Sequence, residues 1–136
     1  AEGYVFHYFL RDVRSGADLF QELNSCSSKS YLMGAMIDTP DGGEHVRADG
    51  LVEGHAYALL QAVAVDGLRL VCLRNPWGGD TQWRGPWSDG DMMWKLHPGY
   101  AARLRPEFAS DGIFWMAWEE FEAVFSNIHI CYRNMR

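Results

Sequence analysis

Apolar residues in the middle of the chain fall into two runs separated by a polar pair. Residues 55–65 and 68–74 are mostly aliphatic, and Asp66-Gly67 stands between them. Asp-Gly between two such runs is the strongest short-range signal for a two-residue β-hairpin turn. The pattern therefore predicts two antiparallel strands, with His55 opening the first and Asn75 closing the second. Because the open ends of a hairpin meet, we expect these two residues to lie side by side.

Shorter patterns predict the other elements. Leu19, Phe20 and Leu23 recur at helical spacing behind Ser15, a residue type that caps helix N-termini. The stretch 75–99 is rich in Gly, Pro, Asp and Trp, so we expect it to be irregular but ordered by its tryptophans. Besides an exposed loop over 40–50, we expect strands over 3–10, 31–37, 112–116 and 128–132, and helices over 15–24, 99–105 and 118–126.

These elements add up to the α+β class, with antiparallel β-sheets and a few short flanking helices. The 136 residues suit a single domain over 1–136, and 48% hydrophobic residues suffice to fill its core. The net charge of -6 argues against nucleic acid or an anionic membrane as a partner, since both need a basic face. No apolar run reaches the ~18 residues of a membrane-spanning helix, so no transmembrane segment is expected.

The three cysteines bear on the compartment. Cys26, Cys72 and Cys131 are widely spaced, odd in number and without a CxxC pair. A disulfide framework or a structural zinc site needs a different pattern. We therefore expect a reducing, cytoplasmic location, with Cys26 following the first helix and the other two cysteines inside strands.

The predicted pairing of His55 with Asn75 has a chemical use. An asparagine oxygen that accepts from the imidazole Nδ1–H fixes the tautomer and leaves Nε2 facing a nucleophile. An amide does this without burying a second charge, which suits a thiolate–imidazolium pair. Trp77, two residues beyond Asn75, is placed to keep water off the His–Asn bond. Gly54 leaves room for a substrate backbone to approach.

Two motifs carry a family resemblance. Gly-His-Ala-Tyr at 54–57 and Arg-Asn-Pro-Trp-Gly at 74–78 resemble the second catalytic subdomain of calpains, which are papain-like cysteine proteases. The resemblance implies peptide-bond hydrolysis by a Cys-His-Asn triad, in which His55 is the general base and acid, Asn75 orients it and Trp77 covers the pair. Further segments resemble the family in the same order, at 18–20, 32–38, 83–89, 111–116 and 128–131.

The same resemblance implies that the chain is one half of a catalytic unit. Calpain nucleophiles are cysteines on a preceding, mainly helical subdomain, which also gives the oxyanion-hole glutamine, and neither is in this sequence. The cysteines present lack the nucleophile's sequence context and are interpreted as packing residues. We therefore expect the isolated chain to be inactive, with the upstream Cys-bearing subdomain as its partner and proteins as substrates. The alternative is a non-catalytic calpain-like binding or scaffolding module.

Calpains also hold a calcium ion in this subdomain, and the ligand set that the resemblance implies is incomplete here. The family has acids at the positions of Gln82 and Ile113. Loss of carboxylates weakens calcium binding, because the number of charged ligands tunes affinity. We therefore expect calcium to bind weakly or not at all, and the alternative for the remaining acids is an ordinary role in solvated loops. The other matching positions, with one displaced acid, are Asp89, Asp111, the carbonyl of Ala109, and Asp80.

Overall fold

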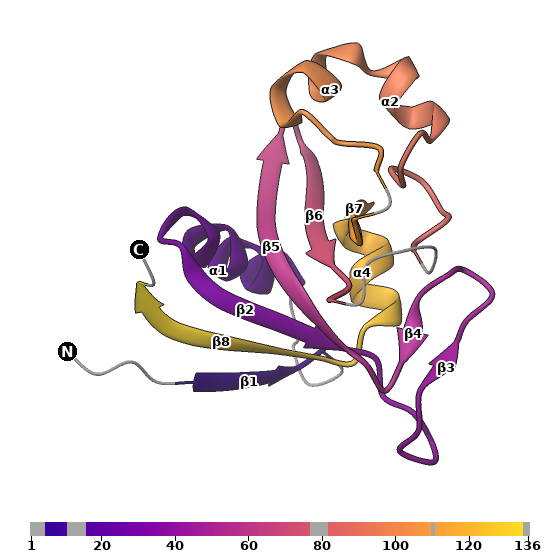
Figure 1. Ribbon diagram of the computed structural model, residues 1–136. Coiled ribbons are helices and arrows are strands. Elements are labelled where there is room, and N and C mark those ends of the chain that lie inside the picture. Colours follow the sequence, from indigo (N-terminus) through magenta and orange to yellow (C-terminus); the bar gives the residue numbers. More distant parts are fainter. Residues whose placement is uncertain (1–4, 11–15, 77–81, 110, 135–136) are drawn as a thin grey trace.

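A computed structural model describes residues 5–10, 16–76, 82–109 and 111–134. Within these residues, six strands form one sheet in the order β1-β8-β2-β5-β6-β7, with every neighbouring pair antiparallel (Figure 1). The predicted α+β class with antiparallel sheets is confirmed. No helix in the same residues is both long and apolar enough to cross a membrane. The strands are β1 (Val5–Phe9), β2 (Tyr31–Met36), β5 (Ala56–Val65), β6 (Leu68–Arg74), β7 (Ile113–Ala117) and β8 (Asn127–Asn134).

The β5–β6 hairpin positions the candidate site. Val65 pairs with Leu68 across Asp66-Gly67, whose φ angles of 50° and 84° are the positive values that a type I′ turn requires. The predicted hairpin is therefore confirmed. His55 lies one residue before β5 and Asn75 one residue after β6, so the two residues flank its open end.

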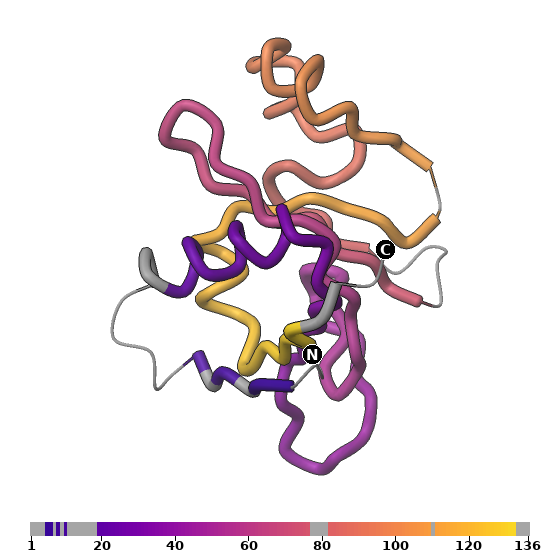
Figure 2. The backbone as a smooth tube through the Cα atoms, turned by 90° about the vertical axis from the view of Figure 1, so that its left-hand side faces the viewer, coloured from indigo at the N-terminus to yellow at the C-terminus, as the bar shows by residue number. Residues whose placement is uncertain are grey.

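Helix α1 (Gly16–Ser28) covers one side of β5 and β2, as the views in Figures 1 and 2 agree. Leu19, Leu23 and Cys26 form its buried face at helical spacing. The helix is longer than the predicted 15–24, and the expectation that Cys26 follows it is wrong. Cys26 is 1% exposed because it extends the apolar stripe about one turn beyond Leu23.

The C-terminal elements agree with the sequence pattern, apart from their bounds. Helix α4 (Trp118–Val124) lies against β6 and β7 and buries Trp118 and Phe121 completely. Strand β8 is longer than the predicted 128–132, because it pairs with β1 on one side and β2 on the other.

The stretch 75–99 is only partly irregular, and the expectation that it holds no regular element is wrong. Helix α2 (Met92–Leu96) lies inside it, and helix α3 (Pro98–Leu104) matches the helix predicted near 99–105. Asp91 caps α2, since its Oδ2 accepts from the Met93 N–H at 3.0 Å. That capping signal was hidden among the other acidic residues of the stretch.

A second apolar cluster attaches α2 and α3 to the hairpin. Trp87, Trp94 and Trp115 are buried, and they pack with Leu70 and Cys72 of β6. The two helices lie toward the turn of the hairpin in Figures 1 and 2. The prediction that tryptophans order this region is confirmed for the residues described.

The expected loop over 40–50 contains a short ladder that sequence patterns did not reveal. Strand β3 (His45–Val46) pairs with β4 (Val52–Glu53), so the expectation of a loop is wrong for β3. The turn between them closes through the Arg47 N–H, which donates to the Leu51 carbonyl at 2.7 Å. This ladder leads directly into His55 and lies beside the open end of the hairpin (Figure 1).

Candidate active site

The structure brings the two predicted site residues together at the open end of the hairpin. His55 Nε2 lies 2.8 Å from Asn75 Oδ1, and the two residues are 6% and 0% exposed. The Asn75 N–H donates to the Gly112 carbonyl at 2.9 Å, which fixes the end of β6. A buried amide oxygen against one ring nitrogen holds the imidazole in one orientation and tautomer. This arrangement is the one that a general base needs.

The ring nitrogen that meets Asn75 is the opposite of the one expected. We expected Nδ1 against the amide, whereas Nε2 makes that contact and Nδ1 lies 2.8 Å from Glu44 Oε2. Nε2 is farther from the backbone of His55, so it is the nitrogen that reaches across the open end of the hairpin. With Asn75 accepting from Nε2–H, the other ring nitrogen, Nδ1, faces Glu44.

Tyr57 supports the imidazole from within the core. Its ring meets that of His55 edge to face, with centroids 5.2 Å apart and planes at 89°. The Tyr57 hydroxyl accepts from the Val52 N–H at 2.8 Å, and burial raises its pKa to about 12, so it stays neutral. Tyr57 thereby links His55 to β4. The sequence motif contained Tyr57 without indicating this role.

Gly54 is required by the fold at the point where the chain enters the site. Its φ is 70°, and a Cβ there would lie 2.5 Å from the Gly43 carbonyl oxygen. Glycine therefore lets the segment before β3 lie directly on the backbone next to His55. The role predicted for Gly54 in admitting a substrate backbone stays a prediction. Trp77, the predicted cover of the His–Asn pair, lies outside the described residues.

Glu44 is the site residue that sequence reasoning missed. Its carboxylate reaches His55 from eleven positions upstream, in a stretch predicted to be an exposed loop. The β3–β4 ladder brings it there, because that ladder places the residue before β3 next to the residues after β4. Only recognition of this two-residue strand pair could have revealed the contact.

Two of the cysteines are chemically unsuited to act as nucleophiles. Burial, with smaller contributions from Asp111 and Asp89, raises the pKa of Cys72 to about 12. Burial, with Glu22 adding to it, raises the pKa of Cys26 to about 11. A nucleophilic cysteine needs a lowered pKa, because the thiolate is the reactive form. These values agree with the interpretation of both cysteines as packing residues.

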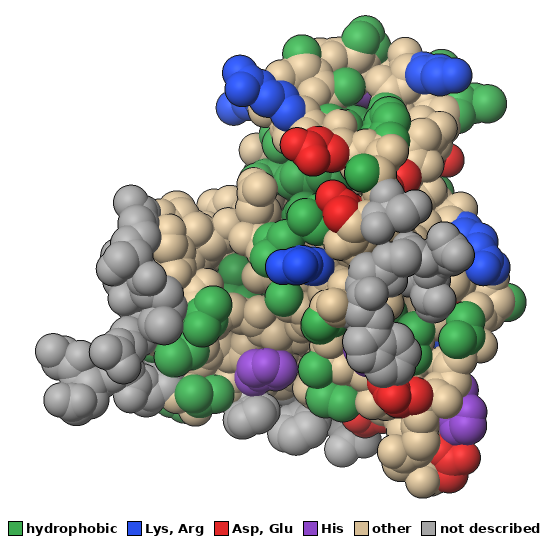
Figure 3. Space-filling model, viewed as in Figure 1, with side chains coloured by type: hydrophobic (Ala, Val, Ile, Leu, Met, Phe, Trp, Pro, Cys, Tyr) green, Lys and Arg blue, Asp and Glu red, His purple; other side chains and the backbone are tan. Residues whose placement is uncertain are grey.

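An apolar cavity of about 350 Å³ opens beside the His–Asn pair. Ala56, Tyr57 and Pro76 bring it against the site, and Gly34 and His129 line its other side. Apolar side chains gather on the face of the sheet seen in Figure 3, over β1, β2 and β8. An apolar pocket of this kind can take an apolar side chain of a bound peptide. Exposed large apolar residues on these strands and on β5 are Val5, Phe6, Leu32 and Leu60.

The residues predicted to hold calcium lie in a second cluster, which the Gln82 amide spans. With that amide oriented to suit both neighbours, Nε2 donates to Asp89 Oδ2 at 3.1 Å and Oε1 accepts from the Gly112 N–H at 3.2 Å. In the opposite orientation Nε2 lies 3.5 Å from the Ala109 carbonyl oxygen. The structure thus brings together Gln82, Asp89 and the carbonyl of Ala109.

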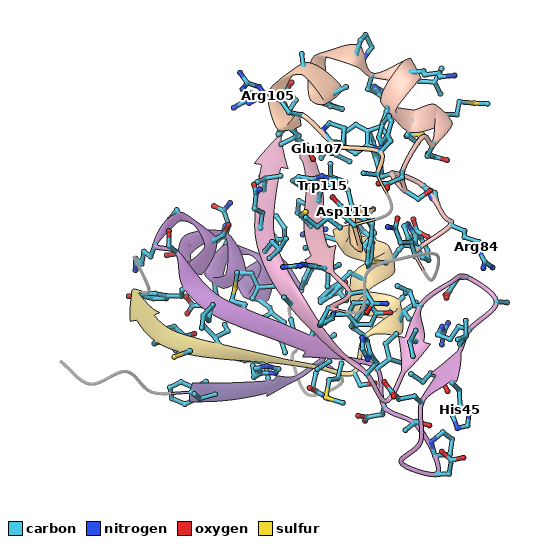
Figure 4. The ribbon with its side chains drawn as sticks, in the orientation of Figure 1. His45, Arg84, Arg105, Glu107, Asp111 and Trp115 are labelled. Carbon is cyan, nitrogen blue, oxygen red and sulfur yellow. The ribbon has the colours of Figure 1, made fainter. Side chains whose placement is uncertain are left out.

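Asp111 completes this cluster on the segment that runs from α3 to β7 (Figure 4). Its Oδ1 accepts from the Ile113 N–H at 3.0 Å, so one oxygen is engaged by its own turn. Burial, with the negative charge of Asp111 adding to it, raises the pKa of Asp89 to about 6. Asp80, the predicted displaced acid, lies outside the described residues.

The described part of this cluster offers two carboxylates, those of Asp89 and Asp111, and one amide side chain. Among the described residues, no group of three or more His, Cys, Asp or Glu side chains comes together in a way that could hold a metal ion. Gln82 presents an N–H donor to Asp89, where a cation site would need another oxygen. The Gln82 N–H thus stabilises the negative charge of Asp89 in part, as a bound cation would.

Comparison with known proteins decides the family. The model of the family described as calpain family cysteine protease matches residues 2–132. The chain belongs to the calpain family. The calpain-type cysteine protease DEK1 of Arabidopsis thaliana is 40% identical over 121 residues, which are 88% of this chain and 5% of that protein. Calpain-A of Drosophila melanogaster is 32% identical over 124 residues, covering 84% of this chain and 15% of its own length. Calpain-9 of Rattus norvegicus is 36% identical over 121 residues, covering 84% and 17%.

This chain therefore spans only 5% to 17% of the length of these three calpains. The family resemblance predicted from the motifs at 54–57 and 74–78 is confirmed. Membership of the calpain family supports a protease-related protein. The roles of individual residues rest on the geometry of the site.

Proposed function

We propose that this chain is the His/Asn-bearing half of a calpain-like cysteine endopeptidase, with His55 as general base and acid and Asn75 as its orienter. The observation that carries the proposal is the buried 2.8 Å contact between His55 Nε2 and Asn75 Oδ1. It lies at the open end of the β5–β6 hairpin, where the chain enters β5 and leaves β6. Calpain family membership gives this pair a reaction, since the family consists of cysteine proteases.

The proposed mechanism assigns each ring nitrogen a task. Asn75 accepts from Nε2–H, so Nδ1 carries the lone pair that removes the proton of a cysteine thiol. The thiolate attacks the substrate carbonyl, and the imidazolium then returns a proton to the departing amine. Water releases the acyl group in a second step with the same base. Because Asn75 is neutral, the imidazolium is oriented without a second buried negative charge.

The nucleophile in this proposal comes from a preceding Cys-bearing subdomain of the parent protein. The raised pKa values of Cys26 and Cys72 make both unsuitable as substitutes. We accordingly propose that the chain alone is inactive and that its substrates are proteins. The cavity beside Ala56 and Pro76 would take a substrate side chain. The three free cysteines favour a reducing, cytoplasmic compartment.

A cleavage assay on the whole catalytic region tests the proposal. The region that includes the preceding half should cleave a peptide substrate, and His55→Ala should lower kcat/KM by about 10²–10⁴-fold. His97→Ala is the matched control, since His97 is exposed at the start of α3 and stacks on Tyr100. Equal cleavage by His55→Ala and wild type would refute the role of His55, and a wild-type region that cleaves nothing would favour a non-catalytic module.

We further propose that calcium binds weakly or not at all at the cluster around Gln82. The support is the amide that faces Asp89 in place of a carboxylate. Isothermal titration of the chain with millimolar calcium measures this directly. A saturating heat at micromolar calcium would contradict the proposal.

A further inference from the structure

The carboxylate of Glu44 contacts Nδ1 of His55, the ring nitrogen that the proposed mechanism needs for the cysteine. Its Oε2 lies 2.8 Å from Nδ1, while Asn75 Oδ1 lies 2.8 Å from Nε2. Both of these oxygens are hydrogen-bond acceptors, so only a doubly protonated imidazolium donates to both at once. A cysteine thiolate pairs with an imidazolium through the same Nδ1. Glu44 and the thiolate therefore compete for one place.

The fold holds Glu44 at that place. Glu44 directly precedes β3, and β3 pairs with β4 so that His45 lies opposite Glu53. One step further along this ladder, Glu44 comes level with Gly54 and next to His55. The backbone register of the β3–β4 ladder therefore places Glu44 beside His55. The contact does not depend on a chance side-chain conformation in a loop.

The segment ahead of Glu44 is shaped by Asp41. Its Oδ1 lies 2.8 Å from His45 Nε2 and accepts from the Gly43 N–H at 2.9 Å. The His45 contact, followed by the Gly43 bond, lowers the pKa of Asp41 to about 2, so this anchor is charged at neutral pH. The Gly43 carbonyl in turn lies against Gly54. Residues 41–44 thus form a turn that packs against Gly54 and contacts His55.

We propose that Glu44 is an internal substitute for the nucleophile: its carboxylate occupies the hydrogen-bonding position at His55 Nδ1 and must leave it before the Cys-His-Asn triad can form. This inference rests on the proposed function, since it takes Nδ1 to be the nitrogen that serves the thiolate. The side chain of Glu44 is 42% exposed and that of His55 only 6%. The carboxylate can therefore turn into solvent while the ring stays in place, and a partly exposed ion pair is a weak restraint.

Chemical modification of the chain as it stands tests the contact. Diethyl pyrocarbonate acylates unprotonated imidazole, and peptide mass mapping separates His55 from the other histidines. We expect Glu44→Ala to raise the rate at His55 about fivefold, because the carboxylate that covers Nδ1 is gone. Glu53→Ala, on the same ladder and bound only to Arg47 among the ion pairs described, should match wild type. Equal rates at His55 in Glu44→Ala and wild type would overturn the proposal.

Cleavage by the full catalytic region tests the consequence. Glu44→Ala should raise kcat/KM by about three- to fivefold, since the thiolate no longer has to displace a carboxylate. A lower kcat/KM would overturn the proposal, because it would make Glu44 a positioning residue of the assembled triad. His55→Ala tests the proposed function separately from the role of Glu44. If cleavage survives His55→Ala, the proposed function fails, while the modification rates still decide whether Glu44 guards Nδ1.

Discussion

Gln82→Glu converts the amide of the second cluster into a third carboxylate. In the wild-type chain, Gln82 Nε2 donates to Asp89 Oδ2 at 3.1 Å and Oε1 accepts from the Gly112 N–H at 3.2 Å. The variant keeps an acceptor for Gly112 but places a negative charge against Asp89, with Asp111 close enough to raise the pKa of Asp89. The perturbation is therefore one of charge, with almost no change in shape.

The expected cost follows from these contacts. Two carboxylates about 4 Å apart repel by roughly 1 kcal/mol in water and roughly 4 kcal/mol at the effective dielectric constant near a protein surface. Both side chains are half-buried, and Asp89, whose pKa is already about 6, can take up a proton to relieve the repulsion, so about 1 kcal/mol is expected. The lost hydrogen bond adds about 1 kcal/mol. In the absence of calcium, the melting temperature of the variant should fall by roughly 7 °C.

Calcium should reverse this loss in the variant only. Three carboxylates with the Ala109 carbonyl make an oxygen-rich set, and a ligand at a hundred times its Kd stabilises the folded state by about 2.7 kcal/mol. Thermal melts with chelator and with millimolar calcium measure the shift. Gln82→Ala is the control, since it loses the bridge without adding charge and should not respond to calcium. A large calcium shift in wild type, or none in Gln82→Glu, would refute the reasoning.

Three further predictions concern stability. Asn75→Ala should lower the free energy of unfolding by about 1–3 kcal/mol in urea, because Nε2 of buried His55 loses its acceptor. Gly54→Ala should cost about 1–3 kcal/mol in the same assay, since an L-residue at φ 70° would also clash with the Gly43 carbonyl. Asp89 has a folded-state pKa of about 6, above its ordinary 3.8, so the unfolding free energy should fall as pH rises between these values and then level off. Asp89→Asn should reduce that slope; an unchanged slope would contradict the assignment.

The main site was predictable because its geometry follows from local pattern. Two apolar runs and Asp66-Gly67 determine a hairpin, and its open end holds both His55 and Asn75, just beyond the Ala58–Arg74 pair. The choice of ring nitrogen was not predictable. It depends on the distance and orientation between the His55 ring and the Asn75 amide, which the sequence does not specify.

The parts that sequence reasoning missed depend on tertiary contacts. Cys26 is helical because its side chain finds a place in the core beyond Leu23, and composition alone does not show that. The β3–β4 ladder has two residues in each strand, too few for any periodicity to appear. Glu44 depends on this ladder, so its contact with His55 could emerge only from the structure.

In the second cluster, the family resemblance located the residues but not their contacts. The motif comparison found Gln82, Asp89 and Asp111 by position and predicted a weakened cation site. It did not show that the Gln82 amide links Asp89 to Gly112, whose carbonyl receives the Asn75 N–H. The substituted residue thus connects the cluster to the end of β6, beside the candidate active site.

The rate at which iodoacetamide alkylates the nucleophilic cysteine of the full catalytic region tests the central claim most directly. If His55 holds that cysteine as a thiolate, wild type should react rapidly even at pH 6, well below the ordinary thiol pKa of about 8.5. His55→Ala should then react only as an ordinary thiol does, with a rate that rises toward pH 8–9. Identical rate–pH profiles for wild type and His55→Ala would show that His55 does not activate a cysteine, and would contradict the proposed function.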